Sequence, residues 1–115
     1  MPKPETHPPL KPLVFDVLLV LHEADCHGYA IAKALQECGQ QVLPGNLYRT
    51  LNGMVDRGLI EKSPRRDGGG DEDERRRYFR ITTFGCELAR AEAERLQDRV
   101  AVARAQRLLS GSRAR

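Results

Sequence analysis

The feature that most constrains the fold is a run of aliphatic residues near the start of the chain. From Leu13 to Leu21 the only polar residue is Asp16, and Pro12 suits the first position of a helix. A helix with almost no polar face has to be covered on nearly all sides. In a chain of 115 residues the other elements must therefore pack around it, and we expect this helix to be central and buried.

Two shorter helices are predicted next. Apolar residues at three- and four-residue spacing indicate a second helix over residues 29–37. After a turn at Pro44 and Gly45, Asn46 is a suitable N-cap for a third helix, which Gly58 closes.

The second half of the chain predicts a hairpin and a long helix. Residues 59–63 and 77–81 alternate in the manner of half-buried strands, with glycines and charged residues between them. Thr82 or Thr83 can cap a last helix that runs to about Leu109. The predicted fold is mainly α with a small β-hairpin, in the order of a winged helix-turn-helix followed by a long C-terminal helix.

Charge is distributed unevenly along the chain. It contains 19 Lys and Arg against 16 Asp and Glu, a net charge of +3. Residues 1–63 hold 6 basic and 7 acidic residues, which leaves 13 and 9 for residues 64–115. A local basic patch attracts phosphate even on a nearly neutral molecule, so this distribution favours a nucleic acid as partner.

The sequence shows no membrane or secretion signal. The longest unbroken apolar run, Val17 to Leu21, is far shorter than the roughly 20 residues of a membrane span. The proline-rich start lacks the apolar stretch of a signal peptide. Cys26, Cys38 and Cys86 are an odd number without a close pair. We expect a cytoplasmic protein with reduced thiols.

The third predicted helix has side chains that can read DNA. If its apolar stripe faces the core, its polar residues face solvent. The major groove admits one helix, where arginine can pair with guanine and asparagine with adenine, while a glycine allows close approach. We therefore expect DNA contacts from Asn46, Arg49, Thr50, Asn52 and Gly53.

Five arginines flank the expected tip of the hairpin. Pairing of the strands would bring their guanidinium groups close together, which suits contact with phosphate or the minor groove. Five acidic residues between them compete for the same arginines. The candidate contacts are Arg65, Arg66, Arg75, Arg76 and Arg77.

A narrow apolar seam runs along the last predicted helix. Its members step by three and four residues, a spacing typical of helices that pair with one another. Such a seam on a long exposed helix favours a homodimer, to which the first helix would contribute; the alternative is that the seam packs on its own domain. The seam comprises Cys86, Ala89, Ala93, Leu96, Val100 and Ala103.

Four short motifs resemble the signature of the PadR family of bacterial repressors. They are His-Gly-Tyr at 27–29, Pro-Gly-Asn-Leu-Tyr at 44–48, Gly-Leu-Ile at 58–60 and Arg-Arg-Tyr-Phe-Arg-Ile-Thr at 76–82, which Gly85 follows. The resemblance covers residues 13 to about 108. It implies a winged helix domain whose single C-terminal helix forms a homodimer.

The resemblance also implies roles for particular residues. Tyr48 matches a tyrosine that lies near the DNA backbone early in the recognition helix, and it can also pack partly against the second helix. The arginines of the hairpin match a basic wing. Two features depart from the family pattern: Asn46 stands where Ser or Thr is usual, and the acidic run in the wing is longer.

Together these features divide the chain into four parts. We expect a disordered arm over residues 1–11, a winged helix DNA-binding domain over 12–82, a dimerisation helix over 83–109 and a frayed tail over 110–115. The predicted function is sequence-specific regulation of transcription, by repression, through double-stranded DNA. No enzymatic activity, metal or cofactor is expected.

Two alternatives remain open at this point. One is a metal- or thiol-responsive sensor built from the scattered histidines and cysteines, and the other is an adaptor that binds proteins instead of DNA. The identity of any inducer is unknown: some relatives bind phenolic acids or flat drugs between subunits, and this chain has no Trp to stack on such a ring. The sensor's candidate ligands are His22, Cys26, His27, Cys38 and Cys86.

Overall fold

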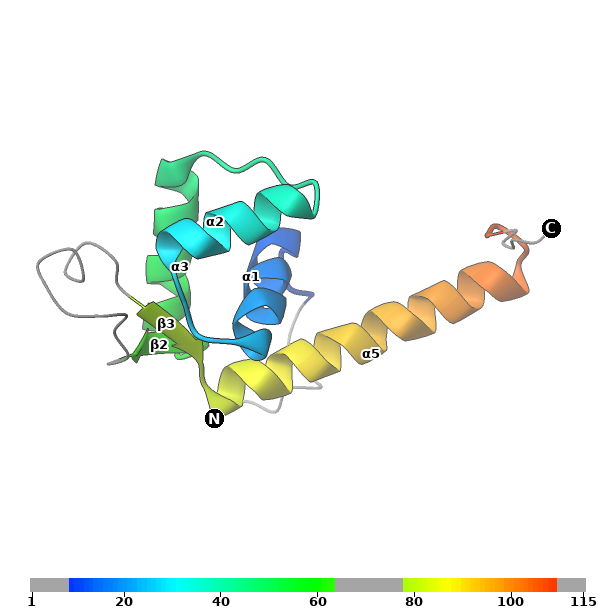
Figure 1. Ribbon diagram of the computed structural model, residues 1–115. Coiled ribbons are helices and arrows are strands. Elements are labelled where there is room, and N and C mark those ends of the chain that lie inside the picture. The colour runs from blue at the N-terminus through cyan, green and yellow to red at the C-terminus, as the bar shows by residue number, and fades with distance from the viewer. Residues whose placement is uncertain (1–8, 64–77, 110–115) are drawn as a thin grey trace, which may run out of the picture.

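The computed structural model describes residues 9–63 and 78–109. These residues form helices and a three-stranded antiparallel sheet of strand order β1-β3-β2, which confirms the mainly helical class. With the labels of Figure 1, the elements are α1 (Pro12–Glu23), β1 (Cys26–His27), α2 (Gly28–Glu37), α3 (Pro44–Asp56), β2 (Ile60–Ser63), β3 (Tyr78–Ile81) and α5 (Thr83–Ala105).

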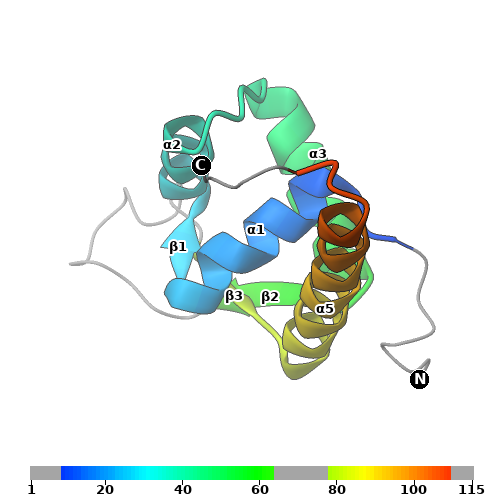
Figure 2. The same cartoon turned by 90° about the vertical axis from the view of Figure 1, so that its right-hand side faces the viewer.

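Helix α1 is the centre of the fold, as its apolar sequence predicts. It packs against α2, α3, α5 and β3, and Figure 2 shows it in the middle of these elements. Val17 and Leu18 have no exposed surface. Leu19 is the exception, because 49% of its surface is exposed. The cover around α1 is therefore incomplete on one side.

The start of α3 differs from the prediction. The helix begins at Pro44, after Leu43 as N-cap, and Asn46 occupies its third position. Proline is well suited to a first helical position, because the N–H that it lacks would have no partner within the helix there. Pro44 and Gly45 thus form the first turn of the helix, and the prediction of Asn46 as the N-cap was wrong.

The hairpin is confirmed, and the sheet has an additional strand. In the hairpin Ile60 pairs with Ile81 and Ser63 with Tyr78. The additional strand, β1, pairs with β3 through His27 and Tyr78. A strand of two residues is too short to show alternation, so β1 could not be predicted from periodicity. Because β1 leads directly into α2, this pairing ties the start of α2 to the hairpin.

Helix α5 starts at a tight junction with Gly58 and Leu59, shortly after the end of α3. The Thr82 hydroxyl accepts a hydrogen bond from the Gly85 N–H (2.9 Å) and donates towards the carbonyls of Gly58 (2.6 Å) and Leu59 (3.0 Å). The Thr82 N–H also donates to the Leu59 carbonyl (3.1 Å). Of the two predicted caps, Thr82 is therefore the one used.

Only glycine fits at position 85 of this junction. A Cβ atom on Gly85 would overlap the carbonyl oxygen of Leu59 and lie 3.0 Å from its carbonyl carbon. These are backbone atoms of a fully buried residue, so they cannot swing aside. The close approach of α5 to Leu59 therefore depends on the missing side chain.

The far part of α5 extends away from the other elements (Figure 1). Its first turns pack on the domain through Leu88 and Ala89. The helix ends at Ala105, earlier than predicted, and Arg107 adopts a left-handed conformation with φ of 63°. The Leu108 N–H then donates to the carbonyl of Ala103 (2.9 Å), which closes the helix.

We predict that Gly85→Ala destabilises the fold, because the added methyl group meets the backbone of Leu59. Overpacking of this kind costs about 1–3 kcal/mol. Gly53→Ala is the matched control, since a Cβ there meets nothing within 4 Å and alanine is favoured over glycine within a helix.

Urea unfolding followed by circular dichroism, at one protein concentration, measures both variants. The free energy of unfolding should fall for Gly85→Ala and stay equal or rise for Gly53→Ala. A Gly85→Ala protein as stable as the unmodified chain would contradict the account of the junction.

Candidate nucleic-acid interface

Helix α3 has one buried and one exposed face. Leu47, Leu51 and Met54 are buried in the core, as the predicted stripe requires. The predicted DNA-contacting residues lie away from this stripe: Asn46, Tyr48, Arg49 and Asn52 are exposed, and Thr50 and Gly53 are partly exposed. Helix α3 and the hairpin lie at the end of the molecule opposite to the far end of α5 (Figure 1).

Two of these exposed side chains bond to each other. Nη1 of Arg49 donates a hydrogen bond to Oδ1 of Asn46 at 2.9 Å. The bond forms because Asn46 lies in the third helical position, three residues before Arg49, and side chains at this spacing are neighbours on a helix. With Asn46 expected at the cap position, this pair was not predicted from the sequence.

Tyr48 contacts the start of α2. A Cβ atom built on Gly28 would lie 2.5 Å from the Tyr48 hydroxyl oxygen, so the ring packs directly on the glycine. The side chain is nevertheless 45% exposed. The expected packing of Tyr48 against the second helix is therefore present, while much of the ring still faces solvent.

Aromatic residues surround the start of α2. Nδ1 of His27, the N-cap, accepts a hydrogen bond from the N–H of Ala30 at 3.1 Å. The His27 ring stacks on Tyr29, with ring centroids 6.2 Å apart, and meets the ring of Tyr78 edge-on at 5.3 Å. From the sequence, His27 was predicted only as part of a motif and as a candidate sensor ligand, and Tyr29 only as part of a motif, because their contacts depend on the pairing of β1 with β3.

The base of the hairpin is held by polar contacts. Arg80 on β3 forms an ion pair with Glu61 on β2 at 2.7 Å, and both side chains are about half exposed. The Ser63 hydroxyl donates to the Asp25 carboxylate at 3.1 Å. An exposed ion pair contributes little stability, so the backbone ladder of the sheet does most of the positioning. The five predicted wing contacts lie outside the described residues: Arg65, Arg66, Arg75, Arg76 and Arg77.

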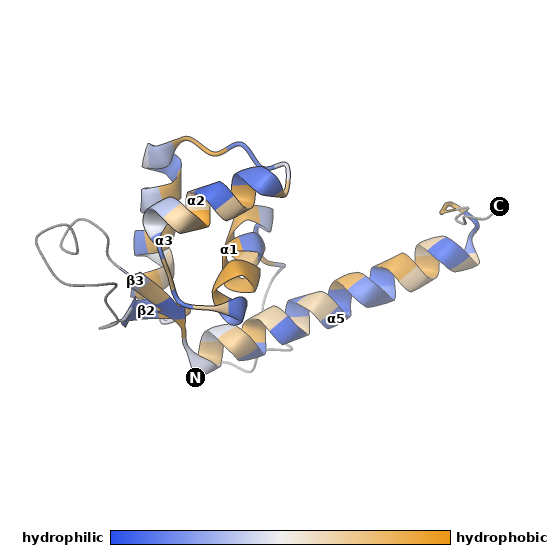
Figure 3. Ribbon diagram, in the orientation of Figure 1, coloured by the Kyte–Doolittle hydropathy of each residue, from blue (hydrophilic) through white to orange (hydrophobic). Residues whose placement is uncertain are grey.

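The predicted seam on α5 falls into two parts. Ala89 is only 8% exposed and belongs to the core of its own domain, and Cys86 is partly buried. Further along, Leu96 and Val100 are 37% and 39% exposed. Ala93 is exposed and Ala103 partly so. Figure 3 shows apolar and charged residues alternating along this projecting part of the helix.

A buried carboxylate lies where α5 leaves the domain. Glu92 is 2% exposed, and both of its carboxylate oxygens accept hydrogen bonds from Arg95, from Nε at 3.0 Å and Nη2 at 2.7 Å. The hydrogen bond to Glu92 raises the pKa of Arg95 above its ordinary value. No role for Glu92 was predicted from the sequence, because a glutamate on a charged helix is usually exposed.

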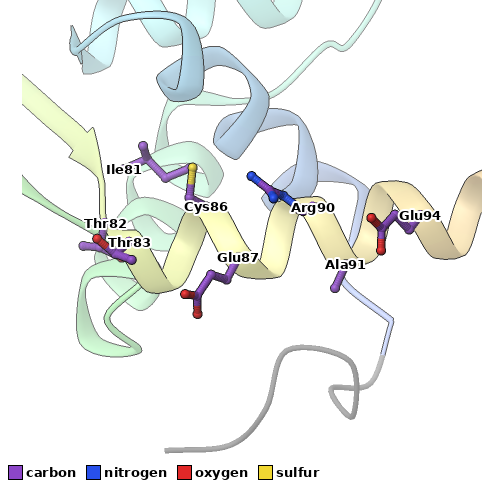
Figure 4. Close-up of a pocket in the computed structure, with 8 residues that line it drawn as sticks. All are labelled: Ile81, Thr82, Thr83, Cys86, Glu87, Arg90, Ala91 and Glu94. Atoms are coloured by element: carbon purple, nitrogen blue, oxygen red, sulfur yellow. The ribbon is translucent and has the colours of Figure 1, made fainter.

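A hollow runs along one side of α5. It has a volume of about 830 Å³ and is lined mainly by α5 residues with the end of β3, among them Cys86 and Arg90 (Figure 4). Cys86 and Arg90 point to one side of the helix in this view, and Glu87 points to the other. The lining mixes both signs of charge, so it does not select an anion or a cation.

Two further observations concern the alternatives. Across residues 9–63 and 78–109, no three His, Cys, Asp or Glu side chains come together in a group that could hold a metal ion. The metal-sensor alternative therefore gains no support from the described residues. No helix among them is long and apolar enough to cross a membrane.

The chain is similar to known regulators of transcription. The family model of the transcriptional regulator PadR-like family matches residues 17–91, more than half of the chain. A PadR family transcription regulator from Clostridium difficile has a TM-score of 0.70 at 24% identity, over 82% of this chain and 96% of that chain. A PadR-like transcriptional regulator from Bacillus cereus has a TM-score of 0.70 at 24% identity, over 87% and 93%.

A third structure is a complex of the RosR protein of H. salinarum. It has a TM-score of 0.65 at 25% identity, over 90% of this chain and 91% of that chain. Among curated proteins there is no match. The solved structures reproduce the winged helix fold, and the matched residues include α3 and both strands of the hairpin. The chain therefore belongs to the PadR-like family of transcriptional regulators, which are DNA-binding regulators and not enzymes.

Proposed function

We propose that this chain is a sequence-specific repressor that binds double-stranded DNA as a homodimer. In this proposal α3 lies in the major groove and the hairpin contacts the backbone or the minor groove. The observation that supports it most is the bonded pair of Asn46 and Arg49 on the exposed face of α3. Both are residue types that recognise bases, and both project from the exposed face of α3, whose other face is buried.

The bond between these two residues prepares Arg49 for base recognition. A guanidinium has five N–H donors in a fixed plane, and Asn46 accepts from only one of its nitrogens. The remaining donors can form a bidentate pair with O6 and N7 of guanine. Because the long side chain is already held, it loses less conformational freedom when DNA binds.

The hairpin supports a second contact with DNA. Its described base is fixed by pairing with β1 as well as within the hairpin, and β2 contacts α3. The segment between β2 and β3 contains the five wing arginines named above. Contacts from arginine to phosphate add affinity and orientation without reading sequence.

The projecting part of α5 supports a homodimer. A helix half that projects from its own domain gains little stability alone, because most helical stability comes from tertiary packing. Here that half exposes Leu96 and Val100, and α1 exposes Leu19. A second copy with the same surfaces can cover them, and its two-fold symmetry would place two α3 helices about one DNA turn apart.

We predict that Arg49→Ala weakens binding to the operator about 10- to 100-fold, because a bidentate arginine–guanine pair is worth about 1–3 kcal/mol. Genome-wide selection with the purified protein, starting from the promoter beside its own gene, supplies the operator duplex. Fluorescence anisotropy titration then measures affinity for this duplex and for a random duplex. The loss should be much smaller on the random duplex, so the ratio of the two affinities should fall.

Arg99→Ala is the matched control, since it removes the same charge from an exposed residue of the projecting part of α5, which extends away from α3 (Figure 1). It should leave both affinities nearly unchanged. Unchanged operator binding by Arg49→Ala would contradict the proposal that α3 reads bases. An unmodified chain whose binding to DNA is absent, or does not weaken as salt rises, would instead favour the adaptor.

We predict that Leu96→Glu converts the dimer to a monomer, because it places a charge in the apolar seam at a site that is 37% exposed in one chain. Gln97→Glu is the matched control, since it introduces a carboxylate at the next residue, which is exposed and off the seam. Light scattering should give the mass of one chain for Leu96→Glu and of two chains for Gln97→Glu. A Leu96→Glu protein that still has the mass of a dimer would refute the proposal that the seam forms the dimer interface.

A further inference from the structure

A close contact joins the first residue of α2 to a side chain of α3. Gly28 is buried, and the ring of Tyr48 lies directly over it. A Cβ atom on Gly28 would be 2.5 Å from the hydroxyl oxygen of Tyr48, 2.8 Å from Cε1 and 2.9 Å from Cζ. Carbon atoms in contact normally stay about 3.5 Å apart or more. The ring can therefore occupy this place only because residue 28 has no side chain.

The position of Gly28 is itself well fixed. The residue before it, His27, pairs with Tyr78 of β3 and caps α2 through the Ala30 N–H. The residue after it, Tyr29, stacks on the His27 ring. The backbone at Gly28 is thus held in place, and the side chain of Tyr48 is the part of the contact that can move.

Tyr48 nevertheless remains partly exposed to solvent. The side chain is 45% exposed and belongs to α3, the helix proposed to enter the major groove. Within residues 9–63 and 78–109 the structure gives its hydroxyl no hydrogen-bond partner. Tyrosine hydroxyls are among the groups that donate to phosphate oxygens in protein–DNA interfaces, where such contacts set register and orientation.

We infer that Gly28 is a positioning residue for DNA binding: by leaving room for the Tyr48 ring, it holds the Tyr48 hydroxyl where it donates to a phosphate of the DNA backbone. This inference rests on the proposed function and extends it to a residue that need not touch DNA itself. A side chain at position 28 displaces the ring. Because the ring is the far end of a flexible side chain, it can give way while α2 and α3 keep their places.

The test is a double-mutant cycle of Gly28→Ala and Tyr48→Phe, measured by fluorescence anisotropy on the selected operator duplex and on a random duplex. Each single variant should bind both duplexes about tenfold more weakly, as expected for loss of a hydrogen bond to a charged group. The ratio of the two affinities should stay unchanged, because a phosphate contact carries no sequence information. The double variant should bind no more weakly than either single variant, since both remove the same contact.

Stability separates this role from a merely structural one. Alanine is the better helix former, so the midpoint of urea unfolding of Gly28→Ala should be no lower than that of the unmodified chain. Three results would overturn the inference: unchanged affinity of Gly28→Ala, losses in the double variant that add up, or failure of Gly28→Ala to fold.

The same titrations distinguish this inference from the proposed function. If the unmodified chain binds neither duplex, the proposed function fails and the inference fails with it. If the unmodified chain binds and Arg49→Ala lowers the affinity ratio while Gly28→Ala has no effect, only the inference about Gly28 fails.

Discussion

The contact between Leu59 and the start of α5 determines how the two functional parts of the molecule lie relative to each other. Leu59 lies three residues after the end of α3 at Asp56, and its carbonyl accepts hydrogen bonds from the backbone and the hydroxyl of Thr82. With Gly85 pressed against the same carbonyl, α5 leaves the domain in one direction only. In a dimer joined through α5, this single backbone contact would set the distance between the two α3 helices and hence the spacing of DNA half-sites.

Those parts of the fold that depend on periodicity could be predicted from sequence. The central place of α1, the hairpin and the buried stripe of α3 all follow from where apolar residues recur. The start of α3 was predicted wrongly because a proline followed by a glycine, as at Pro44 and Gly45, suits a turn as well as the start of a helix. Only the surrounding structure decides between the two. Strand β1 was missed because two residues carry no pattern. The exposure of Leu19 was missed because the hydropathy of a helix does not show which of its sides the other elements leave uncovered.

The candidate site divides in the same way. That Arg49 and Asn52 face solvent follows from the helical period, whereas the bond between Arg49 and Asn46 depends on a helix start that the sequence did not reveal. The packing of Tyr48 on α2 was anticipated through a family resemblance. Its dependence on Gly28 was not, since contacts between residues far apart in sequence follow from the packing of α2 against α3. The same holds for Glu92, whose burial depends on where α5 crosses the domain.

The contact of Tyr48 with Gly28 has a consequence for how related sequences can vary. A clash with the Tyr48 ring can be relieved by replacing the tyrosine with a residue that has a smaller side chain. A larger residue at position 28 is therefore compatible with the fold once position 48 changes as well. The two positions should therefore vary together during evolution, and their covariation would mark the lineages that have given up the tyrosine. Gly85 has no such compensating partner, because it faces a carbonyl that every amino acid possesses.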